Sequence, residues 1–254
     1  MLDLNDRYLA EAKTQFDADG FLKVPAVLTA KDKQAIDAEL DRYVRDIGPT
    51  LPSTDIVWEA EPMPDGSRRI RNLWRMEKYS PLFASIGSRP DLMKLAGTLV
   101  NGEPVVMGVE LFAKPGKVGS VVPFHQDNAY FTLVPPDCFT LWIALDASSV
   151  ENGCVYYARG SHKGPALPHK PSGVLGNSMM AAEVPDGLEE VPGVLEAGDA
   201  MLHHCMTIHR SEPNRSDRSR RGLLIVYRGA HAEKDPEAAR YYNQVRDELQ
   251  ASVA

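Results

Sequence analysis

The amino-acid sequence predicts a mainly β fold of the sandwich or jelly-roll type with flanking helices. From residue 104 onward, short β-like runs alternate with turns rich in Gly and Pro, which is typical of such folds. The first hundred residues carry mainly helical patterns, and no repeat or linker interrupts the chain. We therefore expect one domain over 1–254, with a helical flank (1–103), a jelly-roll core (104–230) and a C-terminal helix (231–254).

The N-terminal region begins with two capped helices. Asn5 is placed to cap a helix that runs to about Asp17, and the apolar run 21–24 after it predicts a short strand. Thr29 is a good N-cap for the second helix, because apolar residues then recur at helical spacing. Gly48 and the proline after it are expected to end this helix.

The rest of the flank predicts a loop and two further helices. Residues 50–68 are rich in Pro, Asp, Gly and Ser, which indicates a loop. Ser80-Pro81 predicts the start of a third helix, with the serine as cap and the proline at its first position. Arg89-Pro90 predicts the start of a fourth helix, which Asn101-Gly102 closes.

The core is expected to contain at least six strands in two sheets that enclose a pocket. A last helix is expected to begin at Asp235-Pro236. The best strand patterns cover Val105–Ala113, Ser120–Phe124, Phe139–Leu145, Gly153–Ala158, Ala200–Cys205 and Gly222–Arg228.

Composition narrows the class of protein. Hydrophobic residues make up 43% of the chain and charged residues 25%, as in globular enzymes, and the net charge of −7 argues against a nucleic-acid surface. No apolar stretch reaches the roughly 20 residues of a membrane helix, and the N-terminus lacks the pattern of a signal peptide. Cys138, Cys154 and Cys205 form no Cys-x-x-Cys motif, which favours a reducing cytoplasm.

His125 and Asp127 form the first part of a candidate metal site. Side chains two residues apart on one strand share a face, so both would point to the same side of a sheet. One remote histidine would complete two imidazoles and one carboxylate, the usual ligand set of non-haem Fe(II) oxygenases. His203, His204 and His209 are the candidates for that third ligand, and of the adjacent pair His203/His204 only one can face inward.

His209 is the preferred third ligand because of the residues that follow it. Ser211 comes two residues later and Arg220 eleven residues later, just before a strand. An oxygenase without a redox cofactor needs an electron donor, and a 2-oxo acid bound to iron can supply it. The far carboxylate of such an acid is best held by a bidentate arginine, and Arg220 suits that role. The alternative is that Arg215, Arg218, Arg220 and Arg221 form a solvated basic run.

An ordered set of motifs resembles the phytanoyl-CoA dioxygenase family of Fe(II)/2-oxoglutarate oxygenases. The resemblance implies a double-stranded β-helix (jelly-roll, cupin-like) core, with Fe(II), 2-oxoglutarate as cosubstrate and O₂. The matching segments are Phe124–Asp127, Leu141–Asp146, Glu151–Cys154, Gly160–Gly164, Gly198-Asp199 and the run from His209 through Ser211, Pro213, Asn214 and Ser216 to Arg220.

The resemblance also assigns roles to individual residues. It implies that His125, Asp127 and His209 are the catalytic iron ligands and that Arg220 holds the distal carboxylate of 2-oxoglutarate. A basic residue upstream of the core also contributes in this family; Arg71 is the nearest match, with Arg69 or Arg75 as alternatives. The positions expected near the cosubstrate are Ser211, Trp142, Gln126 and Arg71.

The expected activity is oxidation of a small molecule. Related halogenases carry a small residue in place of Asp127, so the carboxylate here implies hydroxylation or a related oxidation, with release of succinate and CO₂. We expect a small polar metabolite or natural-product intermediate as substrate, because the chain shows no basic cluster for a CoA phosphate group. The alternatives are an acyl-CoA hydroxylase of the same family, a metal enzyme independent of 2-oxoglutarate, and a non-catalytic jelly-roll binding protein.

Four residues are candidates for substrate contact. Glu110 lies among apolar residues on a predicted strand, where it faces either solvent or the pocket, because a buried carboxylate needs a partner. If it faces inward, it would suit a substrate with an amine or several hydroxyls. Asn128, Tyr130 and Phe131 directly follow the metal motif and are expected to line the pocket, with core packing as the alternative for Phe131.

Overall fold

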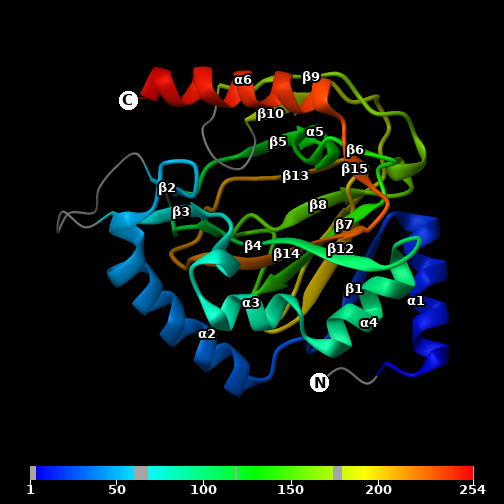
Figure 1. Ribbon diagram of the computed structural model, residues 1–254, viewed down its shortest axis with the longest axis horizontal. Coiled ribbons are helices and arrows are strands. Elements are labelled where there is room, and N and C mark those ends of the chain that lie inside the picture. The colour runs from blue at the N-terminus through cyan, green and yellow to red at the C-terminus, as the bar shows by residue number, and fades with distance from the viewer. Residues whose placement is uncertain (1–3, 60–67, 118, 174–178, 254) are drawn as a thin grey trace.

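The computed structural model describes residues 4–59, 68–117, 119–173 and 179–253. The strands lie in the middle of the molecule, with helices α1–α4 along one side and the C-terminal helix α6 (Pro236–Val253) across the opposite side (Figure 1). Among the described residues, no helix combines the length and the apolar character needed to cross a membrane.

Over the described residues, the larger sheet has seven strands, and each neighbouring pair in it is antiparallel. Its long central strands correspond to the strongest strand patterns of the sequence. In sheet order, the strands are β1 (Phe21–Val24), β12 (Ala200–His204), β7 (Cys138–Ala144), β14 (Arg220–Gly229), β4 (Pro104–Lys114), β3 (Ile70–Leu73) and β2 (Ile56–Trp58).

The smaller sheet has four strands, again antiparallel, and it faces the larger one. Two additional strand pairs lie outside these sheets. The smaller sheet runs β11 (Glu190–Pro192), β8 (Val155–Ala158), β13 (His209–Ser211) and β5 (Val122–His125), and the pairs are β9 (His169–Pro171) with β10 (Met180–Ala182) and β6 (Leu133–Val134) with β15 (Glu233–Lys234).

The expected caps of the first two helices are confirmed. The Asn5 side chain accepts a hydrogen bond from the amide of Tyr8, and Thr29 forms a reciprocal capping box with Asp32. The helices are α1 (Asp6–Asp19), α2 (Ala30–Arg42) with the turns η1 (Tyr43–Ile47) and η2 (Gly48–Thr50), η3 (Met76–Lys78), α3 (Pro81–Gly87), α4 (Pro90–Leu99), α5 (Asn128–Phe131), η4 (Ser161–Lys163) and α6.

Alternation along the central strands divides the interior into two parts. Leu111 and Ile143 belong to the large core beneath helices α1–α4, whereas Trp142 packs between the two sheets. On β4, the same alternation turns Glu110 and Lys114 away from the helical core and toward the space between the sheets. The jelly roll therefore directs polar side chains of a central strand into its own interior.

Two expectations for the flank were wrong. Strand β2 lies within residues 50–68, which were expected to be a loop, and β3 was not expected at all. These three- and four-residue strands are held by pairing at the end of the large sheet, which leaves little signal in local sequence. In addition, Ser80 makes no side-chain cap to α3; its hydroxyl donates to Glu39 instead.

Candidate active site

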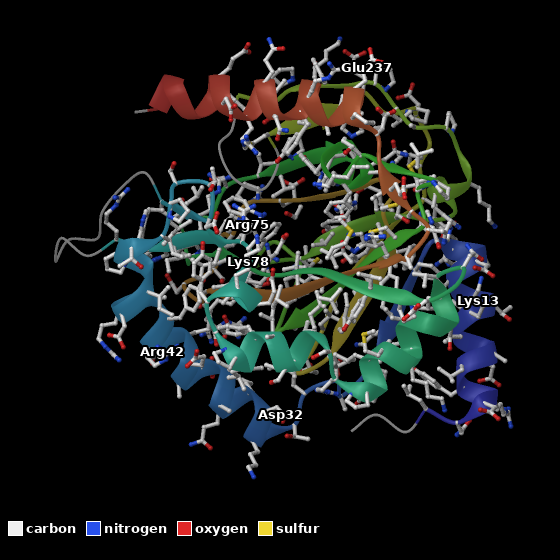
Figure 2. The ribbon with its side chains drawn as sticks, in the orientation of Figure 1. Lys13, Asp32, Arg42, Arg75, Lys78 and Glu237 are labelled. Atoms are coloured by element: carbon white, nitrogen blue, oxygen red, sulfur yellow. The ribbon has the colours of Figure 1, made fainter. Side chains whose placement is uncertain are left out.

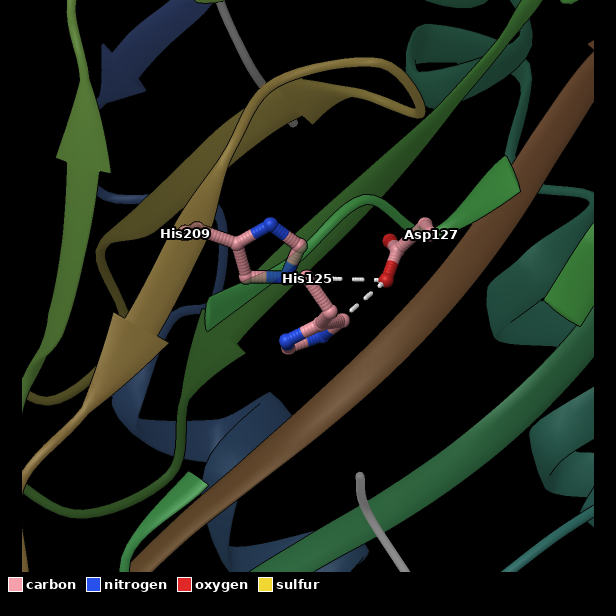
Figure 3. Close-up of side chains that lie close together, drawn as sticks. All are labelled: His125, Asp127 and His209. Carbon is pink, nitrogen blue, oxygen red and sulfur yellow. Dashed lines mark ion pairs between the residues drawn. The ribbon is translucent and has the colours of Figure 1, made fainter. Parts of the chain in front are cut away.

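Two adjacent strands of the smaller sheet bring His125 and His209 together. His125 ends β5 and His209 begins β13, and the two residues are paired directly across the sheet. Their ring centroids are 4.1 Å apart. Asp127 points toward both rings, as Figure 3 shows.

Asp127 reaches the two imidazoles by a different route from the one expected. The strand ends at His125, and Asp127 has helical backbone angles (φ −58°, ψ −28°) as the N-cap of α5. Its carbonyl accepts hydrogen bonds from the amides of Tyr130 and Phe131. The turn into α5, rather than the alternation of a strand, therefore places the carboxylate next to the histidines.

The three side chains form a compact donor set that fits one metal ion. Asp127 Oδ1 lies 3.6 Å from His125 Nε2 and 3.5 Å from His209 Nε2, and the three donor atoms lie within 4.8 Å of one another. His125 and His209 are each only 6% exposed, and Asp127 is 9% exposed. Two nitrogens and one oxygen on one side of a metal leave the remaining coordination positions open.

Hydrogen bonds to the far ring nitrogens prepare both histidines for metal binding. His125 Nδ1 lies 2.8 Å from the carbonyl of Pro123, and His209 Nδ1 lies 2.9 Å from the carbonyl of Thr207. Because a carbonyl can only accept, each Nδ1 carries the proton and each Nε2 keeps its lone pair for the metal. Burial also lowers the pKa of both imidazoles, which favours the neutral form that a metal requires.

The second oxygen of Asp127 is fixed by two donors. Thr140 Oγ1 donates to Asp127 Oδ2 at 2.8 Å, and His203 Nε2 donates to the same oxygen at 3.0 Å. Burial raises the pKa of the Asp127 carboxyl, but His209, His203 and His125 together hold it well below its usual range. The carboxylate therefore presents Oδ1 alone to the metal.

The adjacent histidines that were considered as ligands point to opposite faces, as expected. His203 is 2% exposed and lies beside the metal site, but its Nε2–H is used on Asp127, and its Nδ1 has no hydrogen-bond partner. His204 faces the helical side, with its ring centroid 6.0 Å from that of Phe16. His203 thus orients a ligand, a role that the sequence did not indicate.

We expect Thr140→Val to weaken iron binding without unfolding the protein. Valine keeps the shape of threonine but removes the hydroxyl that holds Asp127 Oδ2. Loss of such an outer partner typically costs about 10- to 100-fold in metal affinity or activity. Competition with a chelator measures the Fe(II) dissociation constant, and Thr98→Val in α4 serves as the control. An unchanged dissociation constant would show that His203 alone orients the carboxylate.

A small cavity next to the metal ligands contains a buried arginine. Arg220 is 2% exposed, and its guanidinium carbon lies 5.1 Å from the centroid of the Trp142 ring. Its Nε has no hydrogen-bond partner among the described residues. Burial lowers its pKa to about 10, so the side chain remains charged at neutral pH. Arg220, Trp142 and Ser211 line this cavity together with His125 and His209. Arg220 is therefore not part of a solvated basic run.

Lys114 is a part of this site that sequence reasoning missed. Its Nζ donates to Ser211 Oγ at 2.7 Å and to the carbonyl of Glu212. Burial is the main cause that lowers the pKa of Lys114 to about 6, and the nearby cations Arg220 and Arg71 contribute to this shift. The signal was present, because Lys114 continues the inward-facing alternation of Glu110 on β4.

Arg71 lies near Lys114 without lining either cavity. It is the extra residue of a β-bulge in β3, where Val57 pairs with Asn72 and Trp58 with Ile70. Burial lowers the pKa of Arg71, and the nearby Glu59 carboxylate opposes that shift. Contact between Arg71 and the cosubstrate stays a prediction.

Gln126 and Asn128, which were expected near the cosubstrate and the substrate, form hydrogen bonds to backbone groups of the protein. The Gln126 side chain donates to the carbonyls of Met206 and Pro165 and accepts from the amide of Leu167, so it joins loops instead of facing the cavity. The Asn128 side chain bonds to both the amide and the carbonyl of Leu133 and closes the turn after α5. Both side chains are thus bonded within the protein, and their contact with cosubstrate or substrate stays a prediction.

A larger cavity of about 520 Å³ opens above the metal ligands, with His125 and Asp127 in its wall. Its other walls come from β4, the segment around η3, α5 and α6. Glu110, Tyr130 and Phe131 line it, so these three candidates for substrate contact do face a pocket. Phe131 also packs against a neighbouring apolar cluster, so the alternative of core packing applies to it as well.

Two buried imidazoles and a carboxylate inside a jelly roll, beside a buried arginine, define the class of Fe(II)/2-oxoglutarate oxygenases. The family described as Phytanoyl-CoA dioxygenase (PhyH) matches residues 16–222. The chain belongs to this family of iron- and 2-oxoglutarate-dependent oxygenases, and its double-stranded β-helix fold is confirmed.

Individual relatives show how far the similarity extends. The dioxygenase lolE1 of Epichloe uncinata is 30% identical over 161 residues, which cover 63% of this chain and 59% of that protein. Phytanoyl-CoA dioxygenase of Arabidopsis thaliana is 33% identical over 155 residues, which cover 59% and 53%. These matches thus span little more than half of each relative's length.

The likeness to solved structures supports the same fold. The epimerase SnoN, solved with Fe³⁺, α-ketoglutarate and nogalamycin RO, superposes with a TM-score of 0.74 at 23% identity. This superposition covers 94% of this chain and 90% of SnoN. At this level of identity, the comparison concerns the fold alone.

Proposed function

We propose that this protein is an Fe(II)/2-oxoglutarate-dependent dioxygenase that hydroxylates, or otherwise oxidises, an unactivated C–H bond of a small polar metabolite or natural-product intermediate. Succinate and CO₂ are the coproducts. One observation carries the proposal: the metal donor set and the unpartnered Nε of buried Arg220 border the same small cavity. A dicarboxylate can reach both from that position.

Different residues of the chain would bind the iron and the cosubstrate. His125, His209 and Asp127 Oδ1 would hold iron, and the guanidinium of Arg220 would bind the distal carboxylate of 2-oxoglutarate. Ser211 accepts from Lys114, so its own hydroxyl hydrogen is free to donate to the same carboxylate. With O₂, iron and 2-oxoglutarate would supply the oxidising power for C–H attack.

The larger cavity supports the substrate class. About 520 Å³ is within the usual range for small-molecule sites, and its walls combine aromatic rings with a few polar groups. Because His125 and Asp127 line this cavity, a substrate bound in it would lie close to the metal. Among the similar proteins, lolE1 is named a dioxygenase and SnoN an epimerase, solved with nogalamycin RO, whereas the Arabidopsis enzyme is named for phytanoyl-CoA.

Anaerobic titration of the apoprotein tests the proposal without knowledge of the substrate. After one equivalent of Fe(II), addition of 2-oxoglutarate is expected to produce a visible metal-to-ligand charge-transfer band that saturates at one equivalent. Succinate release then screens amines, thioesters and other candidates. Iron binding without the band would indicate a metal enzyme independent of 2-oxoglutarate, and absence of iron binding would indicate a jelly-roll binding protein.

A further inference from the structure

Glu110 places a carboxylate in the wall of the larger cavity among apolar neighbours. On β4 it shares the inward face with Gly108 and Phe112, and across the sheet it pairs with Leu224 of β14. Within the described part of the chain, no hydrogen bond or ion pair joins its carboxylate to another group. Glu110 is half-buried, and removing a carboxylate from water even in part is unfavourable unless a partner is supplied.

The electrostatic surroundings of Glu110 increase this cost. Burial is the main cause that raises its pKa to about 8, with smaller contributions from the carboxylates of Asp127 and Glu77, and Arg75 opposes the shift. Arg75 is already held by Asp55 in a two-point ion pair, so its charge is largely neutralised. A cation brought by a ligand would supply the partner that the Glu110 carboxylate lacks among the described residues.

The other cations of the cavity do not neutralise Glu110. Figure 2 shows Arg75 and Lys78 near β3, and Lys78 is an exposed side chain. Arg246 of α6 pairs with Asp247. The positively charged side chains that line the cavity are Arg75, Lys78, Lys234 and Arg246.

The space beside the Glu110 carboxylate is open and has aromatic walls. A Cβ atom at Gly108 would lie 3.9 Å from Glu110 Oε1, so the glycine leaves room next to the carboxylate. Tyr130 and Tyr242 line the cavity with ring centroids 5.7 Å apart, and Tyr130 is fixed through its hydroxyl to the carbonyl of Met180. Aromatic faces next to a carboxylate form a favourable environment for an organic ammonium ion.

We infer that the substrate carries a cationic amino group that Glu110 binds, so that the oxidised C–H bond belongs to a small amine. This inference rests on the proposed function and narrows its substrate class. An ammonium group both donates hydrogen bonds and supplies the missing charge, whereas a neutral hydroxyl group supplies only a hydrogen bond. Glu110 therefore selects for charge and not merely for polarity.

Matched probes test this selection. Wild type, Glu110→Gln and the control Glu77→Gln are first loaded with Fe(II) and 2-oxoglutarate under anaerobic conditions, and all three are expected to show the charge-transfer band. The diamagnetic Zn(II)/2-oxoglutarate forms are then titrated with benzylamine and benzyl alcohol, and with cyclohexylamine and cyclohexanol. Saturation-transfer difference NMR gives the dissociation constants. Glu77 is a suitable control because its carboxylate accepts from the amide of Val109 and stays out of the cavity wall.

On wild type, each amine is expected to bind at least about tenfold more tightly than its alcohol, the value of one charge-assisted contact. Glu110→Gln is expected to reduce this ratio below about threefold, while Glu77→Gln keeps most of it. Equal binding of amine and alcohol to wild type would overturn the inference. A ratio that persists in Glu110→Gln would also overturn it, because the amine would then be bound elsewhere, for example to the metal. Absence of the band in wild type would instead contradict the proposed function.

Discussion

Replacement of Arg220 by leucine is expected to abolish 2-oxoglutarate binding while leaving iron binding intact. Arg220 is a buried cation with an unpartnered Nε beside the metal site, and the carboxylate of the cosubstrate would be its partner. Loss of one member of a buried charge pair costs about 2–5 kcal/mol, or roughly 30- to several thousand-fold in affinity. The charge-transfer titration of Fe(II)-loaded protein measures this effect directly.

Arg221→Leu is a matched control for the loss of one positive charge. The Arg221 guanidinium is bonded to Asp146 and paired with Asp37, so its removal should lower stability but not the affinity for 2-oxoglutarate. Arg220→Leu should not lower the stability of the apoprotein in this way, since it removes a charge that has no carboxylate partner in the described part of the chain. Normal 2-oxoglutarate binding by Arg220→Leu would mean that Lys114 carries the carboxylate instead.

Features that depend on neighbouring residues in the chain were predictable from sequence. The caps Asn5 and Thr29 satisfy the first amides of their own helices, so their signal lies within three residues. The central strands β4, β7 and β14 are buried and rich in apolar residues, and their approximate positions were therefore evident. Strands β2 and β3 were missed because their order comes from pairing at the sheet edge.

In the candidate site, too, local sequence indicated some features and missed others. The spacing of His125 and Asp127 indicated a metal site, but the assumption of a continuous strand was wrong, because the chain turns after His125. Gln126 and Asn128 lie next to the ligands in sequence, yet their side chains bind local backbone groups. Proximity along the chain therefore does not by itself indicate that a side chain faces the metal site.

Long-range partners were outside the reach of sequence reasoning. His203 meets Asp127 only because strand β12 lies beside β7 in the large sheet, which also carries Thr140. Lys114 meets Ser211 across the interior between the sheets. Each contact depends on the assembled jelly roll, and no local pattern distinguishes His203 from His204 as the inward-facing residue.

His209→Gln is expected to weaken iron binding by more than about 100-fold, whereas His203→Gln should cost at most about 10- to 100-fold. The two rings are adjacent, with centroids 4.4 Å apart, but they are protonated on different nitrogens. His209 uses Nδ1–H on the carbonyl of Thr207 and keeps the Nε2 lone pair for the metal. His203 uses Nε2–H on Asp127 and has no lone pair to offer there. Chelator competition on both variants compares the losses.

The His203→Gln variant also tests whether His203 orients Asp127 or is itself a metal ligand. Its amide can donate a hydrogen bond to Asp127 Oδ2, as the His203 ring does, so much of the iron affinity should return relative to His203→Leu. A ligand would behave differently, because an amide is a poor substitute for an imidazole nitrogen on iron. If His203→Gln lost iron as completely as His209→Gln, then His203 would have to turn its ring toward the metal. Asp127 would in that case depend on Thr140 alone for its orientation.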